Sequence, residues 1–190
     1  MPDQDATILP LAGDRERALR WLAIFIFVPC GALLLILFAI TLSHRTPMWL
    51  AGSALLAPLV FLQVLYLIIA ARIRHAGVAL NAQAIGIDSG FGSRLVALQR
   101  LAPRGVREID LTRHPQLRPL LRTWGLGLPG FQGGWYRLRD GRKALCLITD
   151  RNHVTLLEDD AGLVYLVSLA DATPLRRVLQ NAAQYPSRSP

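Results

Sequence analysis

The stretch Leu121–Asp150, LRTWGLGLPGFQGGWYRLRDGRKALCLITD, decides how the second half of the chain folds. It begins with Gly125, Gly127 and Gly130 at the spacing G-x-G-x-x-G, the pattern of a dinucleotide-binding turn. Such a turn needs a strand before the first glycine and a helix after the last, because the pyrophosphate lies on the helix N-terminus. Here a further Gly-Gly pair and the strand-like run WYRLR follow. This context argues against a NAD site.

The rest of this stretch has the pattern of a β-hairpin, and similar strands lie on both sides of it. GGWYRLR is followed by Asp-Gly, the strongest short hairpin signal, and then by KALCLIT. Short apolar runs separated by turn residues are typical of a small β-sandwich or barrel. The seven predicted strands are residues 82–88, 93–98, 105–111, 133–139, 143–149, 153–157 and 163–168. The residues between the third and fourth strands, 112–130, are predicted to form an extended loop.

The last element has a different periodicity. In residues 169–184, LADATPLRRVLQNAAQ, the apolar side chains recur at helical spacing, and Pro174 stands near the start. Asp171 or Thr173 can cap the helix. A helix therefore follows the strands, and residues 185–190 form a tail.

The apolar residues are concentrated near the N-terminus. The chain of 190 residues is 52% hydrophobic, with two uncharged runs at Trp21–Leu42 and Met48–Ala71. As a helix, a 22-residue run spans about 33 Å, close to the thickness of a hydrocarbon core. The five residues SHRTP connect the runs, so we expect an antiparallel transmembrane hairpin. Residues 1–20 are expected to be a mostly flexible tail, in which Asp14 can cap the first helix.

Positive charge predicts the orientation of the hairpin. The net charge is +8, and five basic residues flank the hairpin outside its loop while one lies within it. Cytoplasmic loops carry the excess of Arg and Lys, so both termini are predicted to be cytoplasmic. The six residues are Arg15, Arg17, Arg20, Arg72, Arg74 and, in the loop, Arg45.

Several short motifs resemble the bacterial PH-domain (pleckstrin-homology-like) family of membrane proteins. They are Arg122-Thr123-Trp124-Gly125, Gly134–Leu138, Gly141, Thr149 and Ser168–Asp171, and the likeness covers about residues 76–184. The resemblance implies a mainly β, α+β chain. A two-helix membrane hairpin would be followed by a cytoplasmic PH-like seven-stranded bent sheet, which a C-terminal helix caps. It also implies a bacterial inner-membrane location, and it implies no reaction.

The glycines and their neighbours allow two interpretations. Structurally, Gly125 and Gly127 let the chain turn sharply or cross close to another strand. Functionally, their exposed amides could hold an anion, with Arg122 beside them. The aromatic side chains are a second candidate surface. Trp135 and its neighbour Tyr136 face opposite sides of a strand, so one of them, or Trp124, is available to line a groove.

Basic residues gather around the predicted hairpin tip. Arg137, Arg139, Arg142 and Lys143 flank Asp140-Gly141, where they could meet lipid headgroups or be ordinary solvated charges. The first predicted hairpin offers only Arg94, which does not favour phosphoinositide binding.

Other chemistries find little support in the sequence. Cys30 and Cys146 are not expected to pair, and the four histidines lack ligand spacing, so no metal or cofactor is predicted. Ser168 and Asp171 are interpreted as turn and capping residues rather than as part of a hydrolase site. Neither an enzyme nor a nucleic-acid-binding protein is expected.

Two main functional hypotheses remain, beside a less favoured third one, an enzyme or sensor that holds a small ligand beside GLGLPG. The first is a membrane-anchored interaction module whose domain binds a protein segment, by strand addition for example, or the membrane surface. The second is an accessory or scaffold subunit of an inner-membrane complex that assembles, with a partner or a second copy, through its hairpin. Gln63, the only amide in either apolar run, would then contact the partner helix.

Overall fold

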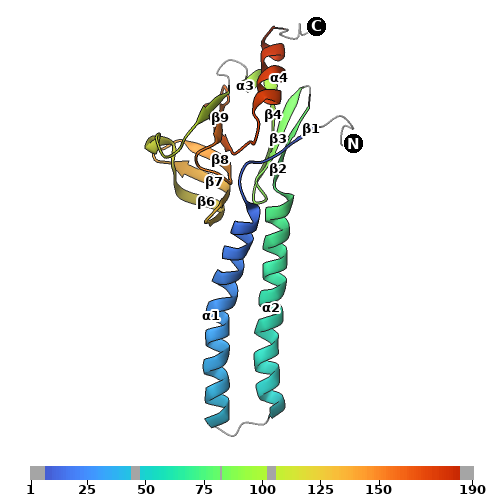
Figure 1. Cartoon of the computed structure of the whole chain (residues 1–190), viewed down its shortest axis with the longest axis vertical. Helices are drawn as coiled ribbons and strands as arrows, with labels where there is room; N and C mark the ends of the chain where they lie inside the picture. Colours follow the sequence, from blue (N-terminus) through green and yellow to red (C-terminus); the bar gives the residue numbers. More distant parts are fainter. Residues whose placement is uncertain (1–6, 44–47, 82, 102–105, 185–190) are drawn as a thin grey trace.

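The computed structural model describes residues 7–43, 48–81, 83–101 and 106–184 (Figure 1). Two long helices extend side by side from one end of a domain built of two sheets and a C-terminal helix (Figure 1). The chain is therefore of mixed α+β class, with two apolar helices. Most of the predicted connecting loop, residues 44–47, and the predicted tail at 185–190 lie outside the described residues.

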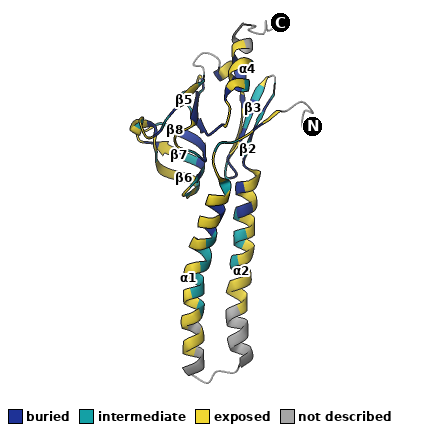
Figure 2. Cartoon of the chain, in the orientation of Figure 1, coloured by how far each residue is buried: buried dark blue, intermediate teal, exposed yellow. Residues whose placement is uncertain are grey.

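The two helices are those that the apolar runs predict. They are α1 (Arg15–Ser43) and α2 (Met48–His75). Asp14 accepts a hydrogen bond from the Glu16 amide at 3.0 Å, which confirms it as the cap of α1. Both helices contain segments that are long and apolar enough to cross a membrane. Away from the domain, most of their described side chains are exposed (Figure 2).

The ends of both helices nearest the domain belong to its hydrophobic core. Ala18 and Leu22 of α1 and Ala70 and Ile73 of α2 are buried in the same cluster as the sheet residues. Packing of this kind is rigid, because interiors are close-packed. The direction of the helices is therefore fixed relative to the domain.

The first sheet has four antiparallel strands. One of its strands is formed by residues 7–9. The expectation that residues 1–20 form a mostly flexible tail was wrong for these three residues. Leu9 is buried and pairs with Val78, so three residues gain backbone pairing and apolar burial that sequence pattern alone does not reveal. In spatial order the strands are β1 (Thr7–Leu9), β2 (Gly77–Leu80), β3 (Ala84–Asp88) and β4 (Ser93–Ala97).

The second sheet has six strands and one parallel pair. β10 lies parallel to β8, and all other neighbours are antiparallel. Among the described residues nine strands follow α2, rather than the predicted seven. In spatial order they are β5 (Arg107–Ile109), β9 (Val154–Glu158), β10 (Val164–Val167), β8 (Lys143–Ile148), β7 (Phe131–Leu138) and β6 (Pro119–Leu128).

The central strands of this sheet are buried on both faces. In β8, Leu145 and Leu147 face the core shared with the first sheet, whereas Cys146 and Ile148 face a second core. Leu111 and Leu117 cover that second core from outside the sheet. Double-sided burial explains why KALCLI is a continuous apolar run instead of an alternating one.

Three short or terminal helices complete the domain. They are α3 (Leu98–Leu101), the 3-10 turn η1 (Pro115–Leu117) and α4 (Thr173–Gln184). Asp171 accepts a hydrogen bond from the Thr173 amide at 2.8 Å, as its capping role predicts. Leu175 and Leu179 are buried against the shared core, so the C-terminal helix is confirmed.

The glycine motif lies in a strand and in the turn that follows it. Residues 119–128, expected to be loop, form β6 and pair with β7. A Cβ atom on Gly125 would lie 2.2 Å from the Gly133 carbonyl oxygen, and one on Gly134 would lie 2.3 Å from that of Trp124. The interpretation that the glycines allow a close crossing of strands is confirmed. A strand follows the motif, in agreement with the rejection of a NAD-binding turn.

We expect Gly134→Ala to destabilise the protein far more than Gly141→Ala. Both glycines have positive φ, and this conformation costs an alanine about 1–2 kcal/mol. Gly134 is enclosed by the β6 backbone, which adds an overpacking cost of about 1–3 kcal/mol, whereas Gly141 has open space. Melting of the full chain in detergent tests this, since each kcal/mol shifts Tm by about 2–4 °C. Equal shifts would show that the crossing is not tight.

Candidate functional site

The outer strand of the larger sheet, β6, presents an unusual surface. It is an edge strand of ten residues, and in the part of the chain that the structure describes it pairs only with β7. Its side chains Leu120, Leu121 and Trp124 are 65%, 60% and 69% exposed. Two register shifts interrupt its pairing, both before Trp124. From Trp124 to Leu128 the strand is regular, with an unpaired outer edge.

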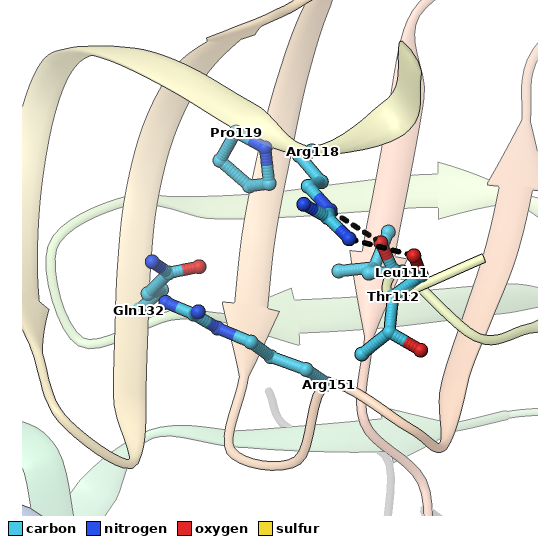
Figure 3. A pocket seen from close by; sticks show the side chains of 6 residues that line it. All are labelled: Leu111, Thr112, Arg118, Pro119, Gln132 and Arg151. Atoms are coloured by element: carbon cyan, nitrogen blue, oxygen red, sulfur yellow. Dashed lines mark hydrogen bonds between the residues drawn. The ribbon is translucent and has the colours of Figure 1, made fainter. Parts of the chain in front are cut away.

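A groove runs along the sheet beside β6. It consists of two adjoining hollows, of about 200 and 650 Å³, which share Pro119, Gln132 and Arg151 as lining residues. We call it the arginine groove, after Arg118, Arg122 and Arg151. The residues come from the start of β6, the start of β7 and the loop between β8 and β9, so only the folded sheet brings them together (Figure 3).

Arg118 holds one wall of the groove in place. Its guanidinium donates hydrogen bonds to the carbonyl oxygens of Leu111 and Thr112, each at 2.6 Å (Figure 3). These bonds tie the segment that covers the second core to the start of β6. Arg118 therefore has a structural task, and its charge remains at the groove.

Arg122 and Arg151 have no comparable internal task. Among the described residues, no carboxylate forms an ion pair with either guanidinium. The Arg151 side chain extends across the groove toward Gln132 (Figure 3). None of the described residues that line the two hollows is acidic. The groove is therefore a concave site of uncompensated positive charge.

Tyr136 forms part of the groove wall. Its hydroxyl donates to the Leu126 carbonyl oxygen at 2.8 Å, which braces the end of β6. Burial raises the pKa of Tyr136 to about 12, and nearby Arg122 opposes this only in part. The phenol is therefore protonated at neutral pH and acts as a hydrogen-bond donor, not as an anion that would neutralise the arginines.

A second cleft has most of its charges paired. It is lined by residues of β5, β9 and η1, and two of its arginines, Arg142 and Arg176, bind Glu158 and Glu108 at 3.0 and 3.1 Å. Its third arginine, Arg107, forms no ion pair with a described residue. Two carboxylates thus offset two of its three arginines, whereas no acidic residue among those described lines the arginine groove.

Two of the four basic residues at the hairpin that the sequence singled out have internal contacts. Arg142 also pairs with Asp140 at 2.7 Å, and the Lys143 ammonium lies 4.7 Å from the centre of the Trp135 ring. Arg137 and Arg139 are exposed. The tip lies at the opposite end of β7 from the turn that contacts α1, about 23 Å away along the strand.

The aromatic residues divide between the two faces of β7, as predicted. Trp135 packs, half-buried, against the core shared with the first sheet, whereas Tyr136 belongs to the second core. Phe131 is fully buried beside Gly133. Trp124 is the exposed aromatic residue of this group.

The polar residues considered for catalysis have structural partners. The Ser168 hydroxyl donates to the Asp150 carbonyl oxygen at 2.7 Å and accepts hydrogen bonds from the Thr149 and Asp150 amides, both at 3.2 Å. Burial raises the pKa of Cys146, so its thiol is unreactive at neutral pH. Among the described residues, no group of three or more His, Cys, Asp and Glu side chains could hold a metal ion.

The chain matches no protein-family model, no curated protein and no solved structure. The resemblance to the bacterial PH-domain family therefore stays a prediction.

The sequence motifs predict Arg122 and the glycines as site residues but give no sign of Arg118 and Gln132. Neither belongs to a motif, and the pairing of β6 with β7 that brings them together was not predicted. A signal was present in LLRTW, where β-branched and apolar residues surround Arg122, but the glycines and prolines on both sides favoured a loop.

We expect Arg118→Ala to loosen residues 107–117, which include the edge strand β5, without unfolding the rest of the sheet. The change removes two charge-assisted hydrogen bonds to backbone carbonyls, each worth about 1.5–3 kcal/mol. Hydrogen–deuterium exchange should increase in that segment and stay constant in β8. The control is Arg113→Ala, because that side chain is 84% exposed and makes one ion pair at 3.5 Å. Similar exchange in the two variants would contradict the bracing role.

Proposed function

We propose that the protein is a non-enzymatic, membrane-anchored interaction module. In this proposal α1 and α2 cross a bacterial inner membrane as a hairpin, with both termini and the domain in the cytoplasm. The apolar length of the helices supports the membrane crossing. The excess of arginines at the domain ends of the helices supports the orientation.

We also infer that the domain is PH-like. The amphipathic helix α4, which packs on a core made by two sheets, supports this assignment. The nine strands after α2 and the parallel pair of β8 and β10 depart from the expected seven-stranded arrangement.

The observation that carries the function is the exposed edge of β6. Unpaired N–H and C=O groups along an edge strand can accept an extended peptide, which adds one strand to the sheet. Exposed Leu121 and Trp124 would contact the alternate side chains of such a peptide. Large apolar side chains exposed on an edge are otherwise an aggregation hazard, which a bound partner removes.

The position of β6 restricts the partner. The turn between β6 and β7 packs against the start of α1, where a Cβ atom on Gly130 would lie 3.7 Å from that of Arg17. An added strand would therefore lie close to the membrane surface. Arg122, an exposed basic residue of β6, would favour acidic side chains on it. The proposed ligand is an extended, partly acidic juxtamembrane segment of another membrane protein.

Site-specific photo-crosslinking tests this proposal. With a photo-reactive amino acid at Leu121 of the full chain in native membranes, we expect crosslinks to one short extended segment of a partner. The same probe at Leu95 is the control, because Leu95 is 77% exposed on the other sheet. We also expect Trp124→Ala to lower the yield at Leu121 by about tenfold or more, as loss of an aromatic anchor does.

Crosslinks from Leu121 to lipid alone would contradict strand addition. Equal crosslinking from Leu121 and Leu95 would also contradict it, because contact with protein would then not depend on the β6 edge.

The exposed amide of Gln63 favours a second candidate function, an accessory subunit that assembles through the hairpin. Gln63 lies on the exposed surface of α2 and has no hydrogen-bond partner among the described residues. It is about 18 Å from the domain end of the helix, near the middle of a bilayer. An amide at that depth gains about 1–2 kcal/mol from a partner helix.

Under this second candidate, Gln63→Leu should weaken assembly in the membrane. We expect the fraction of full chain crosslinked to a partner or to a second copy within the bilayer to fall. Val64→Leu, a neighbouring exposed position, should leave it unchanged. No difference between the variants would remove the support for assembly through Gln63.

A further inference from the structure

We propose that the arginine groove binds a phosphate ester, presented by the headgroup of an anionic phospholipid in the membrane that holds α1 and α2. This inference rests on the proposed membrane insertion. It concerns the face of β6 that turns toward Gln132 and Arg151, not its outer edge.

The contact between the groove and α1 determines how far the groove lies from the membrane. Gly130, at one end of the groove, lies beside Arg17. Arg17 precedes Trp21, where the uncharged run begins, by four residues, or about 6 Å of helix. The headgroup layer of a bilayer is about 5–8 Å thick on each side. This end of the groove therefore lies at the level of the lipid phosphates.

The other wall of the groove is anchored to the segment that leads into α1. The Thr149 hydroxyl donates a hydrogen bond to the Ala12 carbonyl oxygen, directly before α1 begins. Arg151 follows two residues later, and its carbonyl oxygen accepts a hydrogen bond from the Leu111 amide at 3.0 Å. The loop that carries Arg151 is thus anchored both to the chain entering α1 and to the segment over the second core.

The groove has the chemistry that a phosphate requires. A guanidinium binds phosphate oxygens through two parallel N–H donors, and such charge-assisted bonds are about twice as strong as neutral ones. Arg122 and Arg151 offer two such groups without an internal carboxylate partner among the described residues. Gln132 lines the same hollow and adds an amide donor. Two arginines can bind one phosphate that neither alone would hold firmly.

The geometry also separates this groove from the other basic surfaces. At the hairpin tip Arg142 is held by two carboxylates, and in the second cleft two of the three arginines are paired. The arginine groove differs from both because no acidic residue among those described lines it and because its end at Gly130 contacts α1.

Calorimetric titration of the full chain in nonionic detergent tests the proposal. The probes are dihexanoyl-phosphatidylglycerol, dihexanoyl-phosphatidylcholine and inorganic phosphate. We expect the anionic phosphatidylglycerol to bind more tightly than the zwitterionic phosphatidylcholine. The double variant Arg122→Gln/Arg151→Gln should weaken that binding at least about tenfold, the loss expected for two charge-assisted contacts.

The matched control is Arg137→Gln/Arg139→Gln, which removes the same charge from exposed positions outside the groove. This control should bind the lipid as the unchanged chain does. A third variant, Arg122→Lys/Arg151→Lys, keeps the positive charge but loses the paired N–H donors of the guanidinium. Intermediate binding by this variant supports recognition of the phosphate geometry. All variants should keep the Tm of the unchanged chain, because neither groove arginine has an internal ion pair.

Three results would overturn the proposal. The first is equal binding of the two lipids. The second is equal weakening by the groove and control variants. The third is binding of inorganic phosphate as tight as that of phosphatidylglycerol, because the ligand would then be a soluble phosphate. A chain that fails to fractionate with membranes would overturn the proposed insertion, whereas lost lipid discrimination in a membrane-bound chain overturns the groove alone.

Discussion

The short segment that leads into α1 is the constraint on which the rest of the structure depends. It crosses the ends of β8 and β10, where the Ala12 amide donates to the Ser168 carbonyl oxygen at 2.9 Å and the Ala170 amide to that of Pro10 at 3.0 Å. The Thr149 hydroxyl bonds to Ala12 as well. Ala12 is half-buried and its partners Ser168 and Thr149 are buried, so water cannot easily replace the bonds between them. They fix where the first helix starts.

The second sheet is rigid because its central strands are buried on both faces. Side chains such as Leu145 and Leu166 are fully buried, and each contributes about 1.5–3 kcal/mol of transfer free energy. One face packs on the first sheet and on the ends of both helices, and the other packs under the segment that Arg118 holds. The domain and the helix pair therefore form a single packed unit, and a surface of the sheet keeps a defined height above the first apolar turn of α1.

The edge of β6 and the arginine groove share one strand. Arg122 lies between exposed Leu121 and Trp124, yet it faces the groove that Tyr136 and Arg151 also line. A ligand in the groove would order the side chain of Arg122. It would also restrict the backbone at the two register shifts on either side of Arg122. Binding at one side of β6 would thus be linked to binding at the other through a strand whose pairing is locally imperfect.

The sequence by itself determined the two apolar helices, the hairpin at Asp140-Gly141, the opposite faces of Trp135 and Tyr136, and the cap at Asp171. Each depends on neighbours within a few residues. The tertiary structure decided the rest: β1, β6 and its groove, the parallel pairing of β10 with β8, and the carboxylates that hold Arg142. All of these join residues far apart in the chain, and long-range pairing depends on which partners the folded core brings together rather than on local pattern.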